Sequence, residues 1–425
     1  SLLIDTLQCY FEGKKELFDG LKIMELEEEW TEYPVIRLDM SGAGATAAEI
    51  KDYLNLEFSK YEALYSIKPK ETSRESVRFQ VILDTAYQKT GKQVVVLIDE
   101  YDSPLQHSWK TPEHEGCTEV YRSVFSVLKL KGNVLRFVFI TGITKFTQIS
   151  LFSVLNHLTN ISFLPQFAPL CGITEEEMTV NFAPELEALA DKMECSIEEA
   201  HDKLKTYYDG YHFSDENMTD IYNPFSLLNA LSQLRLRNYW ISSGATSMLN
   251  KFVNNMELRL HDFEDCYIDK DTLETSDVIE GGSELFLYQT GYLTIKGFDE
   301  DGYSLGFPNE EVRKALYKAV LPALTQKDIT DIVSIQSRLM HSMNNGNLEE
   351  AKQCMKSLIS NVPYSNKKLV SMDMEERYRL IISTILNAIG CQVEVEHMLS
   401  TGRIDIVAST SRFIYVMELK LANNG

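Results

Sequence analysis

Two acidic residues directly follow a buried strand and have the spacing of a phosphate-binding metal site. Residues 94–98 are Val-Val-Val-Leu-Ile, and Asp99 and Glu100 come next. Such a strand has the form of a Walker B motif, in which the first acid holds the Mg²⁺ that bridges nucleotide phosphates. The second acid, Glu100, is placed to activate a water for attack on the terminal phosphate. The alternative is a buried strand that ends in a solvated acidic turn.

A Walker B strand requires a phosphate loop of the form GxxxxGK[ST], and no such loop occurs in the sequence. Ser1 and the apolar residues after it have the pattern that follows Gly-Lys in this loop. We therefore predict that Ser1 is a hydroxyl ligand of Mg²⁺, and that the missing strand and loop precede it. The alternative is an arbitrary start at a serine. On the first interpretation, this chain binds MgATP more weakly than a chain extended upstream.

A second set of charged residues lies near the end of the sequence. If the hairpin turn is centred between Ser411 and Arg412, Asp405 lies opposite Glu418, and Lys420 shares their face. Two carboxylates so close together are costly unless a cation such as Mg²⁺ lies between them, where it also polarises a phosphodiester. The pattern is that of PD-(D/E)XK nucleases, in which Lys420 would orient water or stabilise charge on the phosphate. The alternatives are a surface hairpin with a Glu-Lys pair, or a nuclease fold without activity.

One further acid belongs to this second set. Glu375 lies three residues before Tyr378, on the apolar face of a predicted helix that ends at Gly390. We expect Glu375 on the inward face, as a supporting acid of the nuclease-like site.

The elements around these residues predict an α/β protein. Residues 1–165 alternate helices with strands at 33–39, 93–99 and 135–141, which indicates a parallel sheet of the P-loop NTPase type lacking its Walker A loop. A polar helical stretch is expected from residue 46 to 90. Residues 166–300 read as a mixed, more helical, lid-like region, with a capping box at 174–177. Residues 301–363 read as an all-helical connector. Residues 364–425 read as a helix and three strands, an incomplete restriction-endonuclease-like domain.

The sequence resembles the predicted AAA-ATPase-like proteins of Bacteroidetes, which carry a C-terminal PD-(D/E)XK nuclease-like domain. The resemblance covers essentially the whole chain, and the combination of motifs is specific. The matching segments are Ser1–Leu7, Tyr10–Gly13, Leu97–Pro104, Phe139–Phe146, Asp209–Phe213, Tyr222–Leu228, Tyr288–Ile295 and Phe307–Val312.

The resemblance implies a bacterial ATPase that uses ATP and Mg²⁺ and is coupled to a nuclease-like domain acting on DNA or RNA. The alternative is a non-catalytic, nucleotide-dependent regulatory or interaction module. Thr141 is implied as a sensor-1-like residue that contacts the γ-phosphate or the water. Lys145 is expected to be a cationic sensor, with a solvated loop lysine as the alternative. In that family a further helix completes the nuclease domain, so the chain looks cut at both ends.

Composition excludes several other classes of protein. The 425 residues include 41 Lys and Arg against 63 Asp and Glu, and this net charge of −22 argues against general coating of nucleic acid or of an anionic membrane. Residues 364–425 carry seven of each sign, which permits approach to a polyanion. The longest apolar run, Val94–Ile98, is too short to span a bilayer. Seven cysteines without metal-ligand spacing predict reduced thiols in a cytoplasmic protein without a zinc site.

Overall fold

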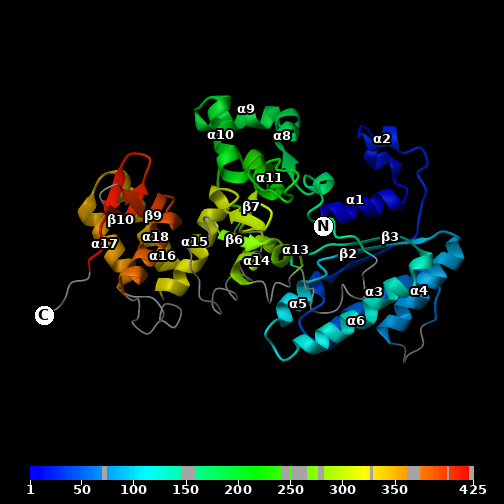
Figure 1. The fold of residues 1–425 in the computed structure, drawn as a ribbon. Coiled ribbons are helices and arrows are strands. Elements are labelled where there is room, and N and C mark those ends of the chain that lie inside the picture. Colours follow the sequence, from blue (N-terminus) through cyan, green and yellow to red (C-terminus); the bar gives the residue numbers. More distant parts are fainter. Residues whose placement is uncertain are drawn as a thin grey trace. The chain divides into compact units, whose positions relative to one another are not determined.

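A computed structural model describes residues 1–68, 74–144, 158–240, 249, 266–275, 282–325, 329–360, 374–399 and 402–420. The chain divides into two compact units, shown along the sequence in Figure 1. Unit 1 comprises residues 1–160 and 271–282, and unit 2 comprises residues 161–270 and 283–425. Each unit is described by itself.

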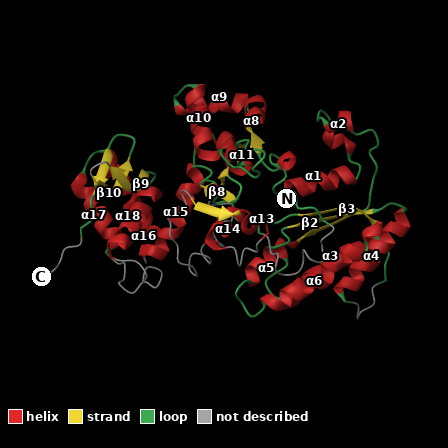
Figure 2. Cartoon of the chain, in the orientation of Figure 1, coloured by secondary structure: helices red, strands yellow, loops and turns green. Residues whose placement is uncertain are grey.

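Unit 1 is built on a parallel sheet of three described strands. β1 (Val35–Asp39), β2 (Val94–Asp99) and β3 (Leu135–Ile140) lie in the order β1-β2-β3. β2 and β3 are labelled in Figure 2. All six residues of β2 are buried, because both faces of this central strand are covered. The parallel sheet predicted from the continuous apolar strands is therefore present.

Helices cover both faces of this sheet. α1 (Leu2–Phe11) lies on one face, where Ile4 packs against Val95 and Leu97. α3 (Ala47–Leu64), α4 (Glu75–Thr90) and α6 (His114–Leu130) lie on the other face (Figure 1). The remaining helical elements of unit 1 are η1 (Lys15–Phe18), α2 (Ile23–Leu26), η2 (Met40–Gly42), α5 (Ser103–Ser108), η3 (Gly132–Val134) and α13 (Lys270–Thr275), whose first residue belongs to unit 2.

The expected continuous helical stretch from 46 to 90 is wrong in its middle. α3 ends at Leu64, and Ser66 has a left-handed backbone with φ of +50°. A serine in this conformation cannot continue a right-handed helix, so the chain turns before α4 begins.

The first part of unit 2 is a small helical core beside a two-stranded sheet. β4 (Ile173–Thr174) pairs antiparallel with β5 (Ile221–Tyr222). The predicted capping box is confirmed, since Thr174 and Glu177 bond each other's main-chain N–H at the start of α8. The other elements are η4 (Pro165–Phe167), α8 (Glu175–Asn181), α9 (Ala183–Met193), α10 (Ile197–Tyr208) and α11 (Pro224–Gln233).

A second antiparallel sheet follows in unit 2. β6 (Cys266–Asp269), β8 (Gly302–Gly306) and β7 (Thr294–Phe298) lie in the order β6-β8-β7. Because β8 occupies residues 302–306, the expectation of an all-helical stretch from residue 301 is wrong for its first residues. The buried Tyr303 and Leu305 of β8 lie two apart, which is the period of a strand. The surrounding helices are α14 (Gly282–Gln289), α15 (Glu310–Thr325), α16 (Ile329–Asn344) and α17 (Leu348–Ile359).

The last part of unit 2 has the predicted order of one helix and three strands. α18 (Met374–Ala388) packs on β9 (Gln392–Leu399) and β10 (Gly402–Ser409). β11 (Ile414–Met417) completes an antiparallel sheet in the order β11-β10-β9. Ile406 pairs with Met417 and Val407 with Val416, which centres the hairpin between Ser411 and Arg412 as predicted.

Candidate functional site

The carboxyl ends of the three parallel strands gather the predicted residues of unit 1. Asp39 and Asp99 are register partners at the ends of β1 and β2. Thr141 follows β3 directly, and its N–H donates to the carbonyl of Ile98 at 2.9 Å. The open end of a parallel sheet is where α/β proteins bind ligands. The structure therefore brings Thr141 next to the end of the Asp99 strand.

Asp99 carries a buried oxygen without a hydrogen bond. Its side chain is 3% exposed, and Oδ1 accepts from the N–H of Glu100 at 3.1 Å. Oδ2 has no hydrogen-bond partner among the described residues, and the nitrogen of Ser1 lies 3.5 Å from it. The Ser1 side chain does not cap α1. That nitrogen is the ammonium group at the start of the sequence, and it forms an ion pair with Oδ2. A buried carboxylate oxygen that faces a positive charge is of the donor type that Mg²⁺ prefers.

Glu100 has an unusual backbone conformation and an unusual environment. Its φ is +51°, in the left-handed region that costs a residue other than glycine about 1 kcal/mol or more. Burial raises the pKa of the Glu100 carboxyl, and the charges of Asp102, Asp99 and Asp39 raise it further. A carboxyl with a raised pKa is a better proton acceptor near neutral pH, which suits a general base.

Two acidic residues near Glu100 were not predicted from the sequence. Asp39 and Asp102 both contribute to the acidic surroundings of Glu100. The sequence could have indicated both residues, because Asp39 ends a predicted strand and Asp102 follows Asp99 by three positions. Lys145 lies outside the described residues.

The paired register of the C-terminal hairpin ends one residue before the predicted pair. Ile406 pairs with Met417, and β11 ends at Met417, so Glu418 lies just beyond the paired residues. Continuing this register by one residue would place Asp405 opposite Glu418, which stays a prediction. Asp405 is 6% exposed, and its Oδ2 accepts from the N–H of Leu419 at 2.7 Å. Glu418 and Lys420 are exposed.

A basic residue from α18 approaches Asp405. Nη1 of Arg379 lies 3.7 Å from Asp405 Oδ1, and Nη2 lies 3.0 Å from Glu396 Oε1. Glu375, one turn earlier on α18, is partly exposed and makes no hydrogen bond or ion pair with Asp405 or Glu418 in the described structure. Sequence reasoning missed Arg379, although its spacing of four from Glu375 places both on one helix face. Within the described ranges, no three His, Cys, Asp or Glu residues are grouped so that they could hold a metal ion.

The Asp209 turn of unit 2 contains another buried carboxylate. Asp209 is 2% exposed, and neither of its side-chain oxygens has a hydrogen-bond partner among the described residues. Lys205 Nζ lies 3.9 Å from Asp209 and 3.8 Å from Asp220. Burial raises the pKa of Asp209 to about 6. Gly210 has φ of +95°, and an added Cβ would lie 2.4 Å from a main-chain oxygen, so the tight turn requires glycine.

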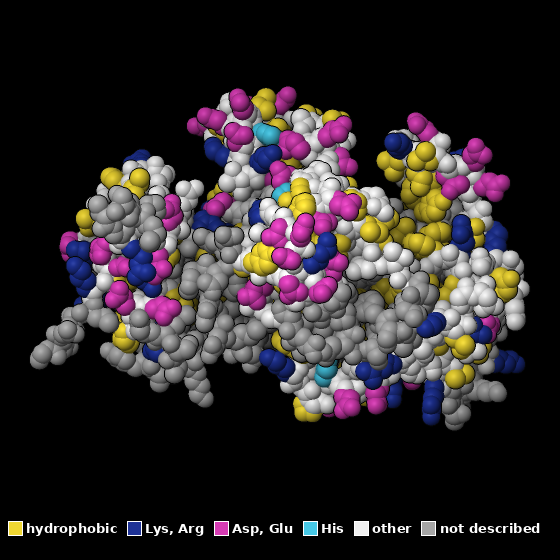
Figure 3. Space-filling model, in the orientation of Figure 1, with side chains coloured by type: hydrophobic (Ala, Val, Ile, Leu, Met, Phe, Trp, Pro, Cys, Tyr) yellow, Lys and Arg dark blue, Asp and Glu magenta, His cyan; other side chains and the backbone are white. Residues whose placement is uncertain are grey.

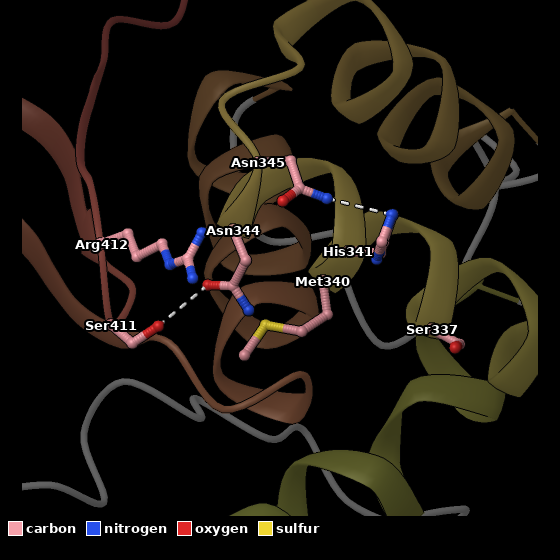
Figure 4. A pocket seen from close by; sticks show the side chains of 7 residues that line it. All are labelled: Ser337, Met340, His341, Asn344, Asn345, Ser411 and Arg412. Carbon is pink, nitrogen blue, oxygen red and sulfur yellow. Dashed lines mark hydrogen bonds between the residues drawn. The ribbon is translucent and has the colours of Figure 1, made fainter.

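A cavity of about 570 Å³ lies between α16 and the turn of the β10–β11 hairpin (Figure 4). Ser411 donates to Asn344 at 3.3 Å across it, and Asn345 bonds His341 at 3.0 Å. The turn lies at the other end of the hairpin from Asp405 and Glu418. The lining comprises Ser337, Met340, His341, Asn344, Asn345, Ser411 and Arg412.

Comparison with known proteins gives a match for the first of these regions. Residues 1–152 match the AAA-ATPase-like family, described as predicted AAA-ATPase. This match supports a nucleotide-binding function. A protein of Azotobacter chroococcum mcd 1, named as an uncharacterized protein in the vnfD 5' region, is 28% identical over 435 residues, which cover 99% of this chain and 80% of that protein. No solved structure matches the chain. The family match ends before residue 364, so the nuclease-like domain stays a prediction.

Two further features concern the surface and the thiols. Acidic side chains are spread over the face of the molecule in Figure 3, and hydrophobic side chains gather on unit 1 near α1 and α2. Among the described helices, none is both long enough and apolar enough to cross a membrane. All seven cysteines are free of disulfide bonds.

Proposed function

We propose that the protein is a Mg²⁺-dependent ATPase whose catalytic edge is formed by Asp99, Glu100 and Thr141. The observation that carries this proposal is the buried Asp99 Oδ2, which has no hydrogen bond and lies 3.5 Å from the nitrogen of Ser1. A buried carboxylate requires an opposite charge, which the ammonium of Ser1 supplies here and which a metal ion at Oδ2 would supply in its place.

Each residue at this edge has a separate role in the proposed reaction. Asp99 and the Ser1 hydroxyl would hold Mg²⁺, which supplies positive charge to the nucleotide phosphates when bound. Glu100 would accept the proton of the attacking water, and its raised pKa suits that task. Thr141 would donate its hydroxyl to the terminal phosphate or to the water.

The topology of unit 1 supports a phosphate loop in front of α1. Crossovers between parallel strands are right-handed in about 98% of cases. The steps from β1 to β2 and from β2 to β3 run in one direction and have their helices on one face. α1 lies on the opposite face (Figure 1). If a strand preceded α1, a right-handed crossover from that strand through α1 to β1 would run across the sheet in the direction opposite to the step from β1 to β2. That strand would pair with the edge of β3 that has no partner among the described strands.

Isothermal titration calorimetry and a phosphate-release assay test the ATPase. The natural full-length chain should bind MgATP and release phosphate, and a chain beginning at Ser1 should bind much more weakly, because loop amides and a lysine supply most phosphate contacts. Equal affinity of the two chains would contradict the position given to Ser1. Absence of MgATP binding by the full-length chain would contradict the function.

We further propose that residues 364–425 form a Mg²⁺-dependent nuclease-like domain acting on DNA or RNA. Asp405 and Glu418 would hold the ion, and Lys420 would orient the water or stabilise charge on the phosphate. The register of the neighbouring pair, Ile406 and Met417, supports this arrangement. Cleavage of labelled single- and double-stranded DNA and RNA with and without Mg²⁺ is the test. Intact binding of nucleotide without any cleavage would favour a regulatory or interaction module instead.

A further inference from the structure

Asp102 is a fully buried carboxylate that joins two loops at the catalytic edge. It lies at the start of α5 but does not cap that helix with its side chain. Instead it accepts from the loop after β3: from the N–H of Ile143 at 3.1 Å, and from the N–H and the hydroxyl of Thr144, the latter at 2.7 Å. Gln106 donates to it from α5. All of these bonds end on Oδ2, and Oδ1 accepts only a second, longer contact from the N–H of Ile143 at 3.2 Å.

Neighbouring contacts tie the same two loops together. The main-chain N–H of Tyr101 donates to the carbonyl of Thr141 at 3.1 Å, and the Tyr101 hydroxyl donates to the carbonyl of Thr144 at 2.8 Å. A Cβ added to Gly142 would lie 2.2 Å from Asp102 Oδ1, so the loop passes too close for any side chain. We name this set, Tyr101 and Asp102 with Gly142 and Thr144, the loop clamp.

The loop clamp depends on the acceptor oxygens of Asp102. Two main-chain N–H groups and one hydroxyl from the 143–144 segment point at this side chain. Oδ2 accepts from all three of these donors and from Gln106, so a leucine at position 102, which has no acceptor atom, would lose every one of these bonds. The charge of Asp102 is costly to bury, and no basic residue among its described partners offsets it. The bonds from the 143–144 segment therefore hold that segment against the start of α5.

We infer that Asp102 is a positioning residue that fixes Thr141 relative to Asp99 and Glu100. Thr141 precedes the clamped segment by one residue, and Asp99 precedes Asp102 by three, so the clamp connects the end of β3 with the end of β2. This role depends on the ATPase function proposed above. Asp102 would act on the proposed reaction only through the position of Thr141, without contacting the nucleotide or the metal.

A double-mutant cycle in the full-length chain tests this role. Asp102→Leu should lower kcat for ATP hydrolysis about 100-fold and leave KM within about twofold, since a misplacement of a catalytic group by about 1 Å can cost that much in rate. Thr144→Val, which removes only one of the donors to Asp102, should give a smaller loss in a chain that folds. Combined with Thr141→Ala, Asp102→Leu should add less than about threefold, because both substitutions act through Thr141. Fully additive losses, or an unchanged kcat in Asp102→Leu, would overturn the positioning role.

Amide hydrogen exchange gives a readout without nucleotide. In Asp102→Leu, which has no acceptor for them, the amides of Ile143 and Thr144 should exchange at least about tenfold faster, while that of Val96 in β2 stays unchanged. Unchanged exchange at 143 and 144 would overturn the clamp while leaving the ATPase standing. A wild-type chain that shows the clamp but neither binds nor hydrolyses MgATP would overturn the ATPase, and the positioning role with it.

Discussion

Asp39 and Asp99 are register partners at the ends of two adjacent parallel strands, yet their carboxylates have different partners. Asp39 Oδ1 accepts from the N–H of Ser41 at 3.1 Å and so caps a short 3₁₀ turn. Asp99 Oδ2 has no hydrogen bond among the described residues. Asp39 is therefore hydrogen-bonded within a turn, whereas Asp99 Oδ2 faces a positive charge, the ammonium of Ser1 at 3.5 Å.

This difference predicts unequal effects of the same substitution. Asp99→Asn should lower the affinity for MgATP at least about tenfold, because it removes the metal ligand. Asp39→Asn is the matched control and should change affinity by less than about threefold, since its amide oxygen can still accept from Ser41. Calorimetry at fixed Mg²⁺ measures both. Equal losses in the two variants would contradict the assignment of Asp99 as the ligand.

Glu100→Gln should separate binding from hydrolysis. The variant keeps nucleotide affinity and loses most turnover, by about 100-fold or more, because only the proton acceptor is removed. The raised pKa of Glu100 also has a consequence for stability. The contribution of the protonated Glu100 to the free energy of unfolding is fully present below the ordinary carboxyl pKa and is lost as pH rises through the raised value. At pH 8 the wild type therefore buries a charge that glutamine does not carry, and Glu100→Gln should be the more stable protein. Hydrolysis at the wild-type rate would exclude Glu100 as the base.

Gly142→Ala should destabilise unit 1 by roughly 1–3 kcal/mol, because the new methyl group would overlap Asp102. Gly132→Ala is the control, since an added Cβ there meets nothing within 4 Å and its φ is not left-handed. Urea unfolding monitored in unit 1 measures the difference. A neutral Gly142→Ala would mean that the loop after β3 can move away from Asp102.

Asp209 should make unit 2 less stable at alkaline pH. Burial raises the pKa of Asp209 from 3.8 to about 6. Its contribution to the free energy of unfolding is therefore fully present below pH 3.8 and is lost as pH rises through 6. Asp209→Asn should therefore melt higher than the wild type at pH 8, with the difference shrinking toward pH 4. Asp202→Asn, at an exposed position of the preceding α10, is the control. A constant difference across this pH range would contradict the raised pKa.

Asp405→Ala and Glu418→Ala should each abolish Mg²⁺-dependent cleavage by the full-length chain, because each removes a proposed metal ligand. Lys420→Ala should slow cleavage while sparing metal affinity, since an ammonium does not ligate the ion. Glu375→Ala should be milder, as a supporting acid. Glu349→Gln on α17 is an exposed control. Metal affinity by calorimetry and cleavage by gel assay separate these effects, and full cleavage by Asp405→Ala would exclude the site.

The sequence by itself was sufficient for features that depend on local periodicity. The continuous apolar run of residues 94–98 predicted a strand buried on both faces, and Asp99 follows it at the carboxyl edge. The position of the hairpin turn between Ser411 and Arg412 followed from the strand pattern, and the pairing of Ile406 with Met417 agrees with it. Such features involve neighbours along the chain or a single hairpin, so few alternative arrangements compete with them.

The tertiary structure alone decided which distant groups meet. Asp102 and Thr144 are 42 residues apart, and only the pairing of β2 with β3 brings their loops together. Arg379, rather than Glu375, reaches Asp405, because the packing of α18 on the sheet selects which side chain of its first turns points there. Hydrophobic patterns specify which face of an element is buried, but the partner of a buried polar group depends on how the elements are packed, and that is a property of the whole fold.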